Sequence, residues 1–243
     1  MLLALRLFKT GNIGTDQVKC WFHNKPIWEE VITNFDCKVP PSVDRVPYVI
    51  DSKEVDEGVL QGFCEQVSRI LGEVHDRRVD IACENFMIAY TKGYGDRVEG
   101  LIRGLQALFL KRDDPSRLLS RRVSRLLSSN KEELSTIEQA VRDSYGLRSR
   151  LSHGNISQSC AESMAVQNLL SLEQYLRESI FYFMALGRTR DLDDVVGQID
   201  NEGKGFDDMK KIRLEANYLF WKGCRRPWRA GDKNVVPVLY VSE

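Results

Sequence analysis

The sequence lacks the closely spaced cysteines and histidines that structural metal sites use. Its 243 residues include three histidines, which lie far apart, and six cysteines, of which no two form a C-x-x-C pair. A structural zinc site needs such ligands at close spacing, and scattered cysteines are usually buried or idle reduced thiols. The sequence therefore predicts no metal centre and no cofactor.

Long hydrophobic runs and an excess of one charge sign are also missing. The apolar start MLLALRLFK is interrupted by Arg6 and Lys9 and lacks the basic start and cleavage pattern of a signal peptide. No other run is long enough to span a bilayer. The 35 basic and 35 acidic residues cancel, so the net charge indicates no partner. We expect a cytoplasmic protein that does not associate with a membrane.

The first fifty residues differ in pattern from the rest of the chain. Two short β-prone apolar runs, LLALRLF and VKCWF, are separated by the turn-rich GNIGTD. The proline-rich VPPSVDRVPYVID that follows cannot lie inside a helix. Residues 1–50 are therefore predicted to form a small β-containing segment and a linker.

From about Val55 the apolar residues recur at helical spacing. The clearest stripe lies within residues 98–109, and Asn130 with Glu133 three positions later is typical of a helix N-cap. Several amphipathic segments joined by short loops are typical of an antiparallel helical bundle. The predicted fold class is mainly α, with this bundle over residues 51–190.

Residues 191–243 are predicted to be a charged C-terminal extension with one helix, near MKKIRLEANYLFWKG. Residues 191–208 hold seven acids and one base, whereas residues 209–233 hold eight bases and two acids. Two interpretations stay open. The two charge blocks attract each other in a solvated tail, or the basic block is an arm that binds nucleic acid.

The stretch LRSRLSHGN, residues 147–155, combines an arginine and a histidine at the expected end of a helix. Arg148 falls within about 40° of the helix's apolar face by the 3.6-residue period. Arginine binds phosphate through paired hydrogen bonds, and histidine exchanges protons near neutral pH. Arg148 and His153 could therefore support transesterification of RNA without a metal. The same spacing also occurs when a surface histidine near a helix end lies beside solvent-exposed arginines that have no function. That non-functional interpretation stays open.

The wider context is more specific than this spacing. The segments FMIAY, GDRVEGLIRGLQALFLK, SRLLSRRVSRLL and IEQAVRDSYGLRSRLSHG, taken together, resemble the HEPN superfamily, and most of all the ApeA-type HEPN domains of prokaryotic defence and toxin proteins. The matching positions are Ala89, Tyr90, Asp96, Arg97, Leu105, Leu108, Phe109, Arg122, Leu126, Leu127, Tyr145, Arg148, Ser149, His153 and Gly154. Two positions depart from the group: Gln106 stands where it usually has Glu, and Ser124 where it has Ala.

The resemblance implies a metal-independent endoribonuclease that forms a homodimer, with two R-x4-H motifs facing each other across one cleft. Arg148 and His153 would be catalytic, with Tyr145 and Ser149 in support. We add Arg150, which is adjacent in sequence and could hold a flanking phosphate. The sequence from Lys111 to Gly154 contains ten basic and six acidic residues. This local excess of positive charge is compatible with a surface along which RNA binds.

The resemblance also implies a role in prokaryotic defence or in a toxin–antitoxin system. In such a system the partner would be an antitoxin or a sensor protein. The first alternative is a non-catalytic HEPN module that binds RNA or scaffolds a partner protein, and Gln106 supports it. The second alternative is a helical interaction domain in which the arginine and the histidine are incidental.

Overall fold

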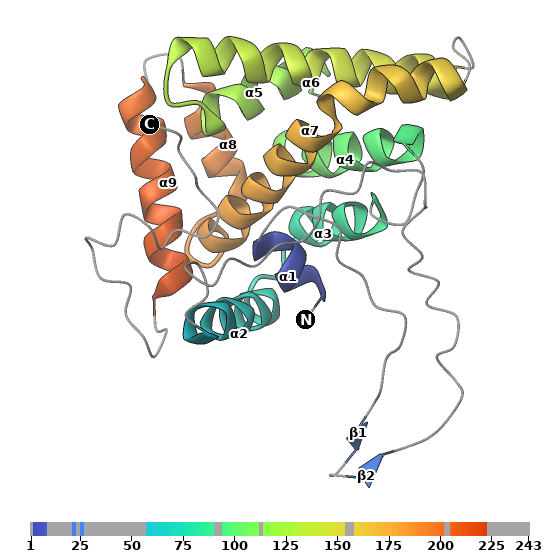
Figure 1. Cartoon of the computed structure of the whole chain (residues 1–243). Helices are drawn as coiled ribbons and strands as arrows, with labels where there is room; N and C mark the ends of the chain where they lie inside the picture. The colour runs from blue at the N-terminus through green and yellow to red at the C-terminus, as the bar shows by residue number, and fades with distance from the viewer. Residues whose placement is uncertain are drawn as a thin grey trace.

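The computed structural model describes residues 2–8, 21–22, 25–26, 57–89, 94–111, 114–153, 158–201 and 205–222. These residues are mainly helical (Figure 1). The helices are α1 (Leu2–Phe8), α2 (Glu57–Glu73), α3 (Arg77–Ala89), α4 (Tyr94–Phe109), α5 (Arg117–Leu127), α6 (Lys131–Ser152), α7 (Gln158–Leu186), α8 (Leu192–Asp200) and α9 (Phe206–Trp221). Among the described residues, no helix has the length and apolar character needed to cross a membrane.

Helix α7 is the centre of the bundle. Figure 1 shows α3, α4 and α6 in successive layers, with α7 crossing them. Every residue from Ile180 to Leu186 is buried, as expected for a helix that is surrounded by others. Gly104 of α4 permits the close approach to α7, because a Cβ there would lie 2.6 Å from Leu176 Cδ2. The apolar stripe predicted within residues 98–109 belongs to α4 and lies in this core.

Helices α5 and α6 form a helical hairpin: they pack against each other and are joined by a short turn, residues 128–130. The Asn130 side chain accepts a hydrogen bond from the Glu133 backbone N–H at 2.9 Å, which confirms the predicted N-cap. The Glu133 carboxylate in turn accepts from the Ser129 N–H at 2.7 Å. One unpaired donor of the first helical turn, the Glu133 N–H, and the N–H of the residue before the cap are thereby satisfied, which fixes where α6 begins.

Residues 2–8 differ from the β-prone run that their composition predicts, because they form α1. Ala4, Leu7 and Phe8 are buried, and their i, i+3, i+4 spacing matches one face of a helix. The Arg6 guanidinium, also buried, donates to the Met87 carbonyl oxygen at 3.0 Å. Burial against the bundle therefore outweighs local β propensity here.

Within residues 1–50, the structure otherwise describes only two short strands. Strand β1 (Trp21–Phe22) pairs antiparallel with β2 (Lys25–Pro26). The rest of the predicted β-containing segment and linker lies outside the described residues and stays a prediction.

Two helices lie in the region predicted to be the C-terminal extension. Helix α9 covers most of the helix that we expected, whereas α8 was not expected. In α8, Leu192, Val195, Val196 and Ile199 are buried at helical spacing, although acids lie between them. Helix α8 packs against α5 and α7, and α9 packs against α7. Residues 223–243, which hold much of the basic block, lie outside the described residues.

Candidate functional site

Helix α6 carries the residues that the sequence predicts to be functional. Its buried face includes Val141, Ser144 and Leu147, and this packing sets the direction of the side chains next to them. His153 is the C-cap, where its backbone N–H donates to the Ser149 carbonyl oxygen at 3.1 Å. The His153 side chain is exposed. Two of the positions that match the HEPN pattern, Tyr90 and Gly154, lie outside the described residues.

Arg148 is half-buried and contacts only neutral groups among the described residues. Its Nη1 donates to Gln106 Oε1 of α4 at 3.3 Å. Its guanidinium carbon lies 5.9 Å from the centroid of the Tyr145 ring, within the range of a cation–π contact. Its Nε is buried without a hydrogen-bond partner. A cation that is partly desolvated and not neutralised by a carboxylate attracts an anionic ligand such as phosphate.

The other buried arginines of the bundle have charged or multiple partners. Arg97 pairs with Glu173 of α7 at 3.0 Å, and both side chains are at most 5% exposed. The Arg213 Nη1 donates to the carbonyl oxygens of Leu126 and Ser128 at 2.6 and 2.9 Å. Arg97 is one of the positions that match the HEPN pattern, and its contacts give it a structural role here.

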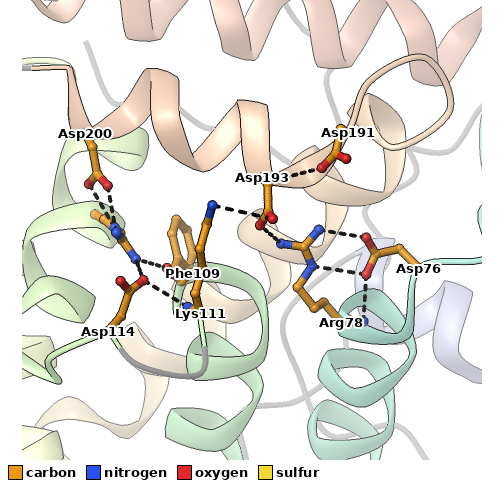
Figure 2. Close-up of polar contacts among 9 residues, drawn as sticks. Asp76, Arg78, Phe109, Lys111, Asp114, Asp191, Asp193 and Asp200 are labelled. Atoms are coloured by element: carbon orange, nitrogen blue, oxygen red, sulfur yellow. Dashed lines mark hydrogen bonds and ion pairs between the residues drawn. The ribbon is translucent and has the colours of Figure 1, made fainter.

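Arg122, another matching position, forms ion pairs with Asp114 and Asp200, both of which are labelled in Figure 2. It binds Asp114, which precedes α5, Asp200 at the end of α8, and the Phe109 carbonyl oxygen. The hydrogen bond from Arg122 holds the pKa of Asp114 below its usual value. Arg122 therefore links the end of α8 to the residues before α5, and its role is structural.

A second group of ion pairs in Figure 2 joins α8 to the start of α3. Arg78 donates to Asp193 at 2.7 Å and to Asp76 at 2.9 Å, and the hydrogen bonds from Arg78 hold the pKa of Asp76 below its usual value. Lys111 Nζ lies 3.4 Å from the Asp193 carboxylate. Asp193 and Asp200 thus pair with bases of the bundle, so Lys111 and Arg122 carry less unpaired positive charge than the sequence count implies.

The structure brings Tyr145 and Arg148 together, but among the described residues Arg148 has no contact with His153 or Arg150. Tyr145 contacts Arg148, and Ser149 lies one helical turn before His153. Arg150 is exposed, and two helical steps turn its side chain about 200° away from that of Arg148. The role of Arg150 beside Arg148 stays a prediction.

The sequence predictions missed two features of this region. Gln106 was noted only as a departure from the family pattern, but it is the hydrogen-bond acceptor for Arg148. The second feature is a cavity of about 280 Å³ between α5 and α6, whose lining includes Arg117, Arg142 and Tyr145. A signal for it was present, because Arg142, Tyr145 and Arg148 recur every three residues along one side of α6.

Among the described residues, no group of three or more His, Cys, Asp and Glu side chains has an arrangement that could hold a metal ion. No protein-family model matches the sequence, and no curated protein or solved structure matches the chain.

Proposed function

We propose that this protein is a metal-independent endoribonuclease of the HEPN type that cleaves RNA with Arg148 and His153. One observation carries the proposal. Arg148 is a half-buried cation whose described neighbours offer an amide oxygen and an aromatic ring but no carboxylate, and an exposed imidazole lies five residues later at the end of the same helix.

The chemistry follows from these two groups. The RNA 2′-oxygen attacks the adjacent phosphorus, the bond from phosphorus to the 5′-oxygen breaks, and the products carry a 2′,3′-cyclic phosphate and a 5′-hydroxyl. The His153 imidazole accepts the proton of the 2′-hydroxyl or donates one to the leaving oxygen. The Arg148 guanidinium stabilises the negative charge that develops on the non-bridging oxygens.

A homodimer completes this mechanism. The base and the acid act on opposite sides of the phosphorus, and one chain supplies a single imidazole at this helix end. A second copy that faces the first across a cleft supplies the other imidazole and a second guanidinium. The resemblance to HEPN domains supports this arrangement, and it also supports a role in prokaryotic defence or a toxin–antitoxin system, where an antitoxin or sensor protein controls the cleft.

The test is cleavage of a labelled single-stranded RNA in EDTA by purified variants. Arg148→Ala and His153→Ala should each lower the rate by at least about 100-fold, because each removes a group that acts in the transition state. His75→Ala is the matched control, since His75 is also exposed but lies between α2 and α3. Full activity in either Arg148→Ala or His153→Ala would refute the proposal, provided that circular dichroism shows an intact fold.

A second candidate function is a non-catalytic HEPN module that binds RNA or scaffolds a partner protein. The ion pairs of Arg78 and Arg122 favour it, because they reduce the cationic surface available to a long RNA. This candidate predicts that the wild-type protein binds RNA or a partner and leaves the RNA uncut, whereas the endoribonuclease cuts it.

A further inference from the structure

We propose that the cavity between α5 and α6, called here the α5–α6 groove, binds the phosphate and base of a nucleotide that flanks the cleavage site. Residues at the start of α5 and in the middle of α6 line the groove. They are Ser116, Arg117, Leu119 and Ser120 from α5 and its N-cap, and Val141, Arg142 and Tyr145 from α6. This inference rests on the proposed endoribonuclease function and extends its substrate-binding surface beyond Arg148 and His153.

The size and lining of the groove fit one nucleotide. Its volume of about 280 Å³ lies at the lower end of the range for small-ligand sites, which is too small for a large cofactor. Leu119 and Val141 are buried and give it an apolar floor. An apolar floor with polar groups around it can hold a flat base and the phosphate attached to it.

The charges at the groove are available to a ligand. Arg117 is exposed and makes no ion pair within the described part of the chain. Arg142 pairs with Glu138 one turn earlier on α6, where both partners are solvent-accessible. Such surface pairs are weak, so a phosphate can replace the carboxylate. These two guanidinium groups, from two different helices, make the groove a site for an anion.

Hydroxyl groups add donors at the same place. Ser116 is the N-cap residue of α5, but its side chain makes no capping hydrogen bond. Its hydroxyl is therefore available to a phosphate oxygen, next to Arg117 on the following residue.

Tyr145 connects the groove to the proposed catalytic arginine. Its side chain lines the groove, and its ring lies 5.9 Å from the Arg148 guanidinium carbon. Arg142 and Arg148 are six residues apart, which is about 9 Å along the helix axis. A single RNA strand with its scissile phosphate at Arg148 can therefore place a neighbouring phosphate between Arg117 and Arg142, with a base against Tyr145. An acidic peptide would use the arginines but not this ring.

The test compares the double variant Arg117→Ala/Arg142→Ala with Arg103→Ala. Arg103 is the matched control, because its side chain is 57% exposed and pairs with Glu99 one turn away on α4, as the 61% exposed Arg142 pairs with Glu138. The readouts are kcat/KM for cleavage of a labelled twelve-nucleotide RNA, and RNA affinity in a His153→Ala background over a range of salt concentrations.

We expect the double variant to lose roughly tenfold in kcat/KM and in RNA affinity, and the slope of log affinity against log salt to become shallower by about 0.7, because one phosphate contact is lost. Arg103→Ala should change neither. If the double variant matches Arg103→Ala while the wild type cleaves and His153→Ala does not, the groove proposal is wrong and the endoribonuclease proposal stands. If the wild type neither binds nor cleaves RNA, both proposals are wrong.

Discussion

Arg148 differs from Arg97 and Arg122 because its hydrogen-bond partner among the described residues is the uncharged amide of Gln106 rather than a carboxylate. A glutamate at position 106, which the ApeA-type pattern usually has, would form an ion pair with the Arg148 guanidinium and neutralise it. With Gln106 the guanidinium is oriented by a 3.3 Å hydrogen bond but keeps its full charge for a ligand. Gln106 is therefore compatible with an active enzyme in which Arg148 binds the phosphate.

This interpretation predicts the effect of Gln106→Glu. The new carboxylate should compete with phosphate for Arg148 and weaken RNA binding by about fivefold, which corresponds to about 1 kcal/mol. Fluorescence anisotropy with labelled RNA in a His153→Ala background measures the affinity.

Gln198→Glu is the matched control for Gln106→Glu. Gln198 accepts a hydrogen bond from Arg190 at 3.2 Å, so this variant adds the same charge beside a different arginine. It should leave the RNA affinity unchanged. An equal loss in both variants, or none in Gln106→Glu, would contradict a phosphate-binding role for Arg148.

Glu178 of α7 is a second residue with an unusual environment. Burial raises the pKa of its carboxyl group above 4.5, although Gln174 donates a hydrogen bond to it and Arg177 and Arg213 oppose the shift. The folded chain therefore binds this proton more tightly than the unfolded chain. Stability consequently falls as the pH rises from about 4.5 through the folded-state pKa.

Glu178→Gln should remove this loss of stability. The amide oxygen can still accept from Gln174, and no charge is buried at neutral pH. We expect a larger free energy of unfolding than that of the wild type at pH 7, with the difference shrinking towards pH 4.5, as measured by urea denaturation. The exposed Glu132→Gln is the control. A destabilised Glu178→Gln at pH 7 would mean that attraction to the two arginines outweighs the cost of burial.

At the scale of helices, apolar spacing predicted the elements that form the core but not their partners. The stripe within residues 98–109 and the cap at Asn130 were predicted correctly, since both depend on neighbours in sequence. Helix α8 was missed because its acids obscure the apolar spacing, and two of them, Asp193 and Asp200, pair with Arg78 and Arg122, which are far away in sequence. The contact between Arg148 and Gln106 likewise spans 42 residues, so only the fold reveals it.

The ion pairs of Arg122 predict how strongly α8 and α5 depend on each other. Arg122→Ala leaves Asp114 and Asp200 without their shared cation and the Phe109 carbonyl without its donor. We expect a loss of about 2 kcal/mol in the free energy of unfolding, because Arg122 is buried but both carboxylates are partly exposed and can be solvated by water after the change. Chemical denaturation measures it. Arg117→Ala, an exposed change on the same helix, should stay within about 0.5 kcal/mol. Similar values for the two variants would contradict a structural role for Arg122.

At the scale of the whole molecule, the ion pairs divide the arginines into two groups. Arg78, Arg97 and Arg122 are neutralised within the bundle and hold α3, α4, α5, α7 and α8 together. Arg117, Arg142 and Arg148 have no partner or only a weak one among the described residues, and all three lie along the α5–α6 hairpin. The zero net charge of the chain therefore conceals three arginines on this hairpin that are not held by strong ion pairs among the described residues.

The most direct measurement is the chemical identity of the RNA ends that the wild-type protein produces in EDTA, with His153→Ala as the comparison. Transesterification by Arg148 and His153 predicts 2′,3′-cyclic phosphate and 5′-hydroxyl ends from the wild type, and no products from His153→Ala. Ends with 3′-hydroxyl and 5′-phosphate groups, or equal cleavage by both proteins, would contradict this mechanism.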